Sequence, residues 1–290
     1  MKKESGDLQI RSRKRGMIRV LILLVGTVLC VCVVLFVQRL AAGQRKRQAV
    51  ETRGEVEILV LGDSIWDLER GETGIAALLE KELPNVTVYN CAIKGSRAAE
   101  DDCGLVAMAE YIAGKRELAF PADVKAPEIL KDVDFSKVDY IFIAYGLNDY
   151  FAAVRRKNPD DCYDVTTYEG ALCASIEMLR ESCPEAEFVI LSPTYCQGYS
   201  YGQVVHESTT FDYGAGTGDD YAASAKRIAE AYGYPFIDNY GELGISIHNG
   251  AAYLEDATHL TEKGRRAYAE NLACHLVDEW QKSGKVDAAE

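Results

Sequence analysis

The sequence lacks the residue patterns of a metal site. It contains nine cysteines and only four histidines, and no Cys-x-x-Cys pair or Cys/His cluster with zinc spacing occurs among them. No metal is therefore expected. Seven cysteines follow the apolar N-terminal run, and this odd number leaves at least one thiol free or paired between chains if that part is extracellular. Small core residues are the simplest role for them.

Basic residues are scarce beyond residue 54. Residues 1–54 hold 12 of the 32 Lys and Arg and 3 of the 45 Asp and Glu, so 20 bases and 42 acids remain, a net charge of −22. This balance excludes a nucleic-acid partner and predicts repulsion from anionic lipid head groups. No internal repeat or low-complexity tract occurs. With 48% hydrophobic and 27% charged residues, the composition is that of a globular domain.

A long apolar run lies near the N-terminus. Residues 17–38 contain one charge, Arg19, and about twenty residues at 1.5 Å each cross a hydrocarbon core of roughly 30 Å. We interpret them as a single-pass transmembrane signal anchor in contact with the lipid bilayer. The alternative is a signal peptide cleaved near residues 41–43, which would release a secreted protein.

The anchor divides the chain into segments. Residues 1–16 form a basic tail whose Lys and Arg predict a cytoplasmic location. Residues 39–54 form a polar linker, and residues 55–282 form the domain, which is then extracellular at the cell membrane. Residues 283–290 are a short tail.

The domain alternates apolar runs with helical patterns, as a parallel α/β sheet does. Strands are predicted at residues 56–61, 86–89, 138–145, 188–191 and around 236–237. Helices are predicted at residues 72–83, 98–113, 168–182, 220–232 and 261–281. Residues 114–137 and 192–219 are predicted as long loops, and the tyrosines of the second one are interpreted either as a sugar- or acyl-binding rim or as ordinary surface.

Ligands of parallel sheets bind beyond the carboxyl ends of the strands, so the polar residues after each apolar run are the candidates. Gly62-Asp63-Ser64 follows the first strand, and Asn90 to Ser96 follows the second. Gly-Leu-Asn-Asp, with Asn148, follows the third, and Asp-Ala-Thr-His lies before the last helix. Each block alone is also a good turn or helix cap, and Trp66 is either a pocket residue or a core residue.

Together the blocks are complete for acyl transfer. Ser64 needs a base, and the three-residue spacing of Asp256 and His259 allows the carboxylate to orient the imidazole that serves as one. An oxyanion needs donors, and three are available at this sheet edge: the Ser64 amide at a helix N-terminus, a backbone amide at Gly95, and the side chain of Asn148.

These four blocks, in this order, resemble those of the SGNH, or GDSL, hydrolases over roughly residues 56–282. The resemblance implies a three-layer α/β/α fold with a central parallel sheet of about five strands. It implies that Ser64, His259 and Asp256 are the catalytic residues, that Ser64, Gly95 and Asn148 form the oxyanion hole, and that no cofactor is used. Ala92 stands where many members carry glycine, so the amides of Lys94 and Ser96 are alternatives to that of Gly95.

The family implies ester chemistry without fixing the substrate. We expect a serine esterase acting on O-acyl, and specifically O-acetyl, groups of a cell-surface or environmental glycan. The alternatives are a lipase or lysophospholipase, an O-acyltransferase, and a surface binding module without catalysis.

Overall fold

The computed structural model describes residues 27–282 except 29, 32, 36, 39, 40, 42, 52 and 202. The described residues fall into two units, one up to Glu51 and one from Arg53 onward. Those of the first unit are helical. The predicted tails at 1–16 and 283–290, and much of the predicted anchor at 17–38, lie outside the described residues. Within the described part of the chain, no helix is both long and apolar enough to cross a bilayer.

A five-stranded parallel sheet forms the centre of the second unit. Its strands are β1 (Val56–Gly62), β2 (Val86–Asn90), β3 (Tyr140–Ala144), β4 (Glu187–Leu191) and β7 (Phe236–Ile237), in the order β2-β1-β3-β4-β7. All five predicted strands are confirmed. Every residue of β3 and all but one of β1 are buried, which explains why these strands are continuous apolar runs and do not alternate.

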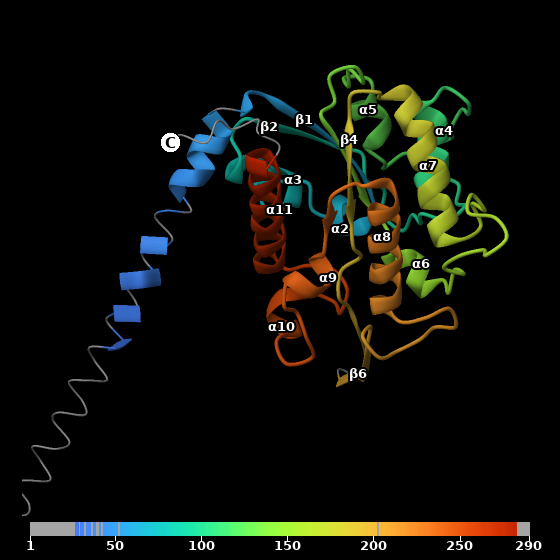
Figure 1. The fold of residues 1–290 in the computed structure, drawn as a ribbon. Helices are drawn as coiled ribbons and strands as arrows, with labels where there is room; N and C mark the ends of the chain where they lie inside the picture. Colours follow the sequence, from blue (N-terminus) through green and yellow to red (C-terminus); the bar gives the residue numbers. More distant parts are fainter. Residues whose placement is uncertain are drawn as a thin grey trace, which may run out of the picture. The chain divides into compact units, whose positions relative to one another are not determined.

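Helices cover both faces of the sheet, so the predicted three-layer architecture is confirmed (Figure 1). One layer contains α3 (Ile75–Glu82) and α11 (Glu262–Lys282), and the other contains α4 (Leu105–Ile112), α7 (Tyr168–Ser182) and α8 (Gly218–Tyr232). The long helix α11 buries Leu272, Leu276 and Trp280, the i, i+4, i+8 positions of its apolar stripe.

Short elements fill the connections. They are α2 (Ser64–Asp67), α5 (Ala126–Leu130), α6 (Leu147–Phe151), α9 (Asn239–Glu242), α10 (Gly250–Tyr253) and an antiparallel hairpin of β5 (Gln197–Ser200) and β6 (Gln203–Glu207). Both segments predicted as long loops therefore contain structure: α5 lies in the first, and the hairpin lies in the second.

The helix predicted over residues 98–113 is shorter than expected, because it begins only at Leu105. The amides of Ala98 and Ala99 donate to the two oxygens of Asp149 at 2.8 and 2.9 Å. These bonds hold the residues before Leu105 in a loop conformation. Ala98, Ala99 and Cys103 are buried although they lie in a loop, and a sequence pattern does not distinguish such burial from that of a helix face.

Five cysteines of this unit are buried free thiols: Cys91, Cys103, Cys173, Cys183 and Cys196. Burial raises the pKa of the Cys91 thiol to about 12 and that of Cys183 to about 11. These side chains are protonated at neutral pH and pack as small apolar groups, as the sequence predicted.

The direction in which strands are added to the sheet reverses between β1 and β3. The chain adds β2 on one side of β1 and then β3 on the other, so the connections after β1 and β3 leave in opposite directions. In the register of this pair, Gly62 lies beside Ala144. The residues that follow β1 and β3 therefore emerge next to one another.

Candidate active site

Ser64 is the first residue of α2, directly beyond the carboxyl end of β1. Asp63 caps this helix with an extended backbone, and its Oδ1 accepts a hydrogen bond from the Ile65 amide at 3.0 Å. The turn thus fulfils the capping role that the sequence allowed. It also holds Ser64 at the sheet edge, where its side chain meets a residue from far along the chain.

That residue is His259, from the loop between α10 and α11. His259 Nε2 lies 2.9 Å from Ser64 Oγ, and His259 Nδ1 lies 2.7 Å from Asp256 Oδ2. The structure therefore brings together Ser64, His259 and Asp256, the three residues that the sequence proposed as a triad. A carboxylate on Nδ1 leaves Nε2 unprotonated and able to accept the serine proton.

Backbone contacts fix the carboxylate of this pair. Asp256 Oδ1 accepts the amides of Thr258 and His259 at 3.1 and 2.9 Å. Burial acts to raise the pKa of Asp256, but these hydrogen bonds and the one to the His259 ring outweigh it, so the pKa lies below its ordinary value. Asp256 is therefore an anion at neutral pH. The next residue, Ala257, has a left-handed backbone with φ 82°, and its carbonyl accepts the Gln197 amide at 2.8 Å.

Asn148 follows β3 on the short helix α6. Gly146 precedes this helix with φ 128°, and a Cβ there would lie 2.7 Å from Tyr168 Oη, so only glycine allows the chain to turn at this point. Asn148 Nδ2 donates to the Ser96 carbonyl at 2.9 Å. This bond ties α6 to the loop of residues 90–96, which holds the remaining predicted donor.

Within that loop the structure distinguishes the three candidate amides. The Lys94 amide donates to Asp67 Oδ2 at 2.7 Å, and the Ser96 amide donates to the Ile93 carbonyl at 3.2 Å. The Gly95 amide has no acceptor within the described part of the chain. Gly95 is exposed and has φ 77°, a conformation that favours glycine. Of the three alternatives, Gly95 is the one whose amide is free to meet a ligand.

The site thus joins a serine, an imidazole and a carboxylate with amide donors beside them, which is the equipment of acyl transfer. A family comparison agrees with this geometry. Residues 60–267, which contain all four sequence blocks, match the model of the GDSL-like Lipase/Acylhydrolase family. The protein is a GDSL-like hydrolase. No match was found among curated proteins.

Solved structures share the fold of this GDSL-like hydrolase at low sequence identity. A possible lipase from Chitinophaga pinensis is 19% identical with a TM-score of 0.55, covering 80% of this chain and 100% of its own. A protein from Lactobacillus plantarum is 22% identical with a TM-score of 0.58, covering 78% and 98%. A member of the lipolytic G-D-S-L family from Veillonella parvula is 18% identical with a TM-score of 0.50, covering 74% and 95%.

Two buried acids support the hydrolase's site without having been predicted for it. Burial raises the pKa of Asp63 to about 7. The hydrogen bond from the Ile65 amide acts to lower this pKa, and repulsion from Asp149 acts to raise it further. Burial likewise raises the pKa of Asp149 to about 6, although the hydrogen bonds from the amides of Ala99 and Ala98 act to lower it. Asp149 belongs to the Gly-Leu-Asn-Asp block, so its position beside Asn148 was the available signal. Its function is to shape the loop that follows Ser96.

Several aromatic and histidine side chains have ordinary structural roles. Trp66 is fully buried, and its Nε1 donates to Tyr268 Oη at 3.4 Å, so it is a core residue and does not line an open pocket. His206 stacks on Phe211 with ring centroids 3.9 Å apart, and His275 Nε2 lies 2.6 Å from Glu242 Oε2. In the residues that the structure describes, no His, Cys, Asp and Glu side chains gather as metal ligands.

Proposed function

We propose that this hydrolase is a serine esterase that cleaves O-acetyl esters of a glycan through a covalent acyl-enzyme. The observation that carries the proposal is the unbroken chain of contacts from Ser64 Oγ through the His259 ring to Asp256, with distances of 2.9 and 2.7 Å. Both lie within the range that proton transfer requires.

In the first half of the reaction, Ser64 Oγ attacks the ester carbonyl while His259 Nε2 takes its proton. The imidazolium is stabilised by Asp256 and then protonates the departing alcohol oxygen, so that the alcohol leaves and the acyl group stays on Ser64. In the second half, His259 deprotonates a water that attacks the acyl-enzyme. The acid departs, and the proton returns to Ser64 Oγ.

Charge on the carbonyl oxygen builds up twice in this cycle, and the donors proposed for it are the amides of Ser64 and Gly95 and the Asn148 side chain. Asn148 is held by one N–H on the Ser96 carbonyl, which leaves its second N–H for the substrate. The site needs no metal or organic cofactor in this mechanism, because the protein donors stabilise the charge.

An aromatic surface supports a sugar as the alcohol part of the substrate. Tyr199, Phe211 and Tyr213 are exposed on the hairpin and the loop behind it. The Gln197 amide of the hairpin donates to the carbonyl of Ala257, between Asp256 and His259, and Tyr150 on α6 donates to the Phe211 carbonyl at 2.9 Å. The hairpin and the loop after it are thus bonded to the two segments that carry His259 and Asn148, and we place the sugar of the substrate on their aromatic side chains. Tyrosine presents apolar area with a polar tip, which suits a sugar ring.

We further propose that residues 17–38 anchor the protein in the cell membrane with the hydrolase domain outside. The length of the apolar run and the six basic residues before it support this orientation. Full-length protein expressed in a bacterium should then resist carbonate extraction from membranes, and protease added to intact cells should digest the domain. If the protein instead appears in the medium without residues 1–43, the N-terminal segment is a cleaved signal peptide and not an anchor.

The catalytic part of the proposal is tested with Ser64→Ala. Replacing the nucleophile should lower turnover of 4-nitrophenyl acetate by about 10³-fold or more, with an unchanged melting temperature. Wild-type turnover in this variant would reject Ser64 as the nucleophile. A wild-type protein that hydrolyses none of the esters tested would instead be a binding module that keeps the fold.

The substrate is tested with two sets of esters. The proposal predicts faster hydrolysis of 4-nitrophenyl acetate than of the octanoate and dodecanoate, and release of acetate from an O-acetylated polysaccharide. Tyr213→Ala should raise KM for the polysaccharide without changing the kinetics of 4-nitrophenyl acetate, and Tyr163→Ala, an exposed tyrosine outside the rim, is the matched control. A preference for long chains indicates a lipase, and acetyl transfer to an added sugar in competition with water indicates an acyltransferase.

A further inference from the structure

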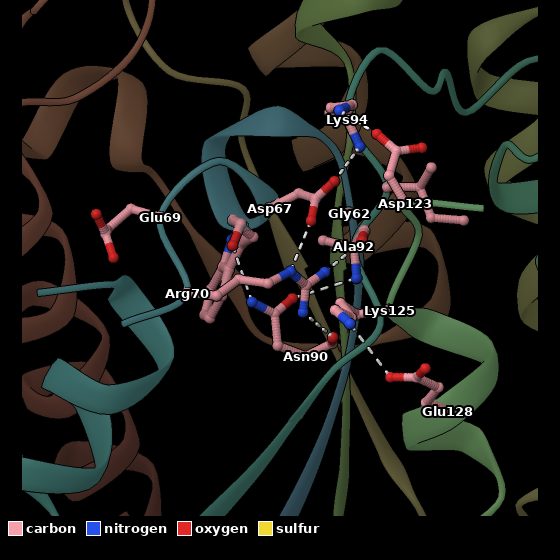
Figure 2. A network of polar contacts seen from close by, with 12 residues as sticks. Gly62, Asp67, Glu69, Arg70, Asn90, Ala92, Lys94, Asp123, Lys125 and Glu128 are labelled. Carbon is pink, nitrogen blue, oxygen red and sulfur yellow. Dashed lines mark hydrogen bonds and ion pairs between the residues drawn. The ribbon is translucent and has the colours of Figure 1, made fainter. Parts of the chain in front are cut away.

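Arg70 lies at the centre of a polar network that joins the chain after α2 to the loop of residues 90–96 (Figure 2). Its Nε donates to Asp67 Oδ1 at 2.6 Å, its Nη1 to the Asn90 carbonyl at 2.8 Å, and its Nη2 to the Ala92 carbonyl at 2.7 Å. A planar guanidinium directs donors to three acceptors at once, which the single ammonium of lysine does not match.

The two carbonyls that Arg70 binds lie on the open side of an edge strand. β2 is the outermost strand, and beyond it the amides of Cys91 and Ile93 still donate to β1, at Val60 and Gly62. The N–H and C=O of a trans peptide point in opposite directions, so the carbonyls of Asn90 and Ala92 face away from β1. Arg70 thus supplies the hydrogen bonds that a further strand would otherwise provide.

Asp67 extends the same contact to the next residues of the loop. One of its oxygens binds Arg70, and the other accepts the Lys94 amide at 2.7 Å. The following amide is that of Gly95. Asp67 and Arg70 have side chains only 12% and 22% exposed, so the bonds of Arg70 are partly shielded from water, whereas the bond from the Lys94 amide is exposed. The ion pair of Lys94 with Asp123 is exposed on both sides and contributes little to the position of the loop.

We propose that Arg70, together with Asp67, is a positioning residue that holds the loop of residues 90–96 so that the Gly95 amide meets the oxyanion. The proposal rests on the esterase function proposed above. Arg70 touches neither Ser64 nor His259, and it acts through the backbone of the loop. The oxyanion exists only after attack. Loss of the hydrogen bonds from Arg70 to the loop therefore weakens binding of the transition state and not of the substrate.

The test compares variants that remove different parts of the network. Arg70→Met, which keeps an apolar side chain of similar length, should lower kcat for 4-nitrophenyl acetate by about 10- to 100-fold with KM within about twofold, since one donor of the oxyanion hole is misplaced. Arg70→Lys should lie between Arg70→Met and wild type. Asp67→Asn replaces one acceptor by a donor, so either Arg70 or the Lys94 amide loses its partner, and kcat should again fall.

Arg53→Met is the matched control. Arg53 is also a shielded arginine, 14% exposed, and it pairs with Asp139 at 3.0 Å beside the start of β3, at the opposite end of the sheet. This variant should lose stability comparably and keep its kcat. Equal losses of kcat in Arg70→Met and Arg53→Met would reduce Arg70 to a stabilising residue and overturn the proposal.

Binding of a butylboronic acid separates positioning from stability, because it forms a tetrahedral adduct on serine that occupies the oxyanion hole. Its Kd should rise in Arg70→Met by the same factor by which kcat falls, and an unchanged Kd contradicts the proposal. Ser64→Ala is measured alongside. If Ser64→Ala keeps wild-type turnover, Ser64 is not the nucleophile, and the role of Arg70 beside it fails as well. Loss of turnover in Ser64→Ala with normal kinetics in Arg70→Met instead refutes the role of Arg70 alone.

Discussion

Asp256→Asn tests the geometry of the base. Asp256 uses one oxygen for the amides of Thr258 and His259 and the other for the His259 ring. An asparagine oxygen keeps both amide bonds, so the loop retains its shape while an NH2 group faces Nδ1. The ring then has to accept a hydrogen bond at Nδ1 and carry its proton on Nε2. In this tautomer Nε2 donates to Ser64 and is unable to take the serine proton.

The size of the effect follows from the exposure of the carboxylate. Replacing a buried triad carboxylate by an amide lowers kcat by about 10⁴-fold. Asp256 is 58% exposed, so water partly takes over its role. We expect a loss of about 10²- to 10³-fold in kcat, equivalent to about 3–4 kcal/mol, with little change in KM.

The assay is hydrolysis of 4-nitrophenyl acetate at saturating substrate, with a melting curve for each variant. Asp160→Asn makes the same chemical change at an exposed aspartate outside the site and should behave as wild type. If Asp256→Asn retains kcat within about threefold of wild type while folding normally, the carboxylate does not orient the base and the reasoning fails.

Three further substitutions probe the surroundings of the triad. Asn148→Ala removes a proposed oxyanion donor and should cost about 10²- to 10³-fold in kcat; unchanged kcat would remove Asn148 from the oxyanion hole. Gly146→Ala places a methyl group 2.7 Å from Tyr168 Oη at φ 128° and should lower the free energy of unfolding in urea by about 2–4 kcal/mol; equal stability would show that the turn adapts. Asp63→Asn should match wild-type stability at about pH 3, below the ordinary pKa of 3.8, where Asp63 is largely protonated whether folded or unfolded. Because folding raises the pKa of Asp63 to about 7, wild type loses stability relative to this variant as pH rises towards 7, by at most about 4 kcal/mol, and a pH-independent difference in urea midpoints would contradict the cause given for that shift.

The sheet was predictable because parallel strands buried on both faces are continuous apolar runs with Gly, Asn or Asp at their ends. The helix prediction was wrong at residues 98–104, where Ala98 and Ala99 are buried in a loop and not on a helix face. Here a carboxylate about fifty residues away, Asp149, binds two amides and prevents a helix. A local pattern does not contain such a long-range contact.

The residues of the site were predictable as a set, because each polar block follows a strand or precedes the last helix. The choice of the Gly95 amide over those of Lys94 and Ser96 needed the structure, because it rests on the hydrogen bonds that occupy the other two amides. Arg70 was not identified, since an arginine in the connection between two helices has no distinctive sequence signal. Its role depends on which carbonyls face the open edge of β2.

The most direct test of the account is the site of covalent reaction. A fluorophosphonate should add once to each chain, and peptide mass spectrometry should place the adduct on Ser64. Ser64→Ala should take up none, and His259→Ala should react slowly because its serine has no base. An adduct on another residue, or equal labelling of Ser64→Ala, would contradict the claim that Ser64 is the nucleophile of this hydrolase.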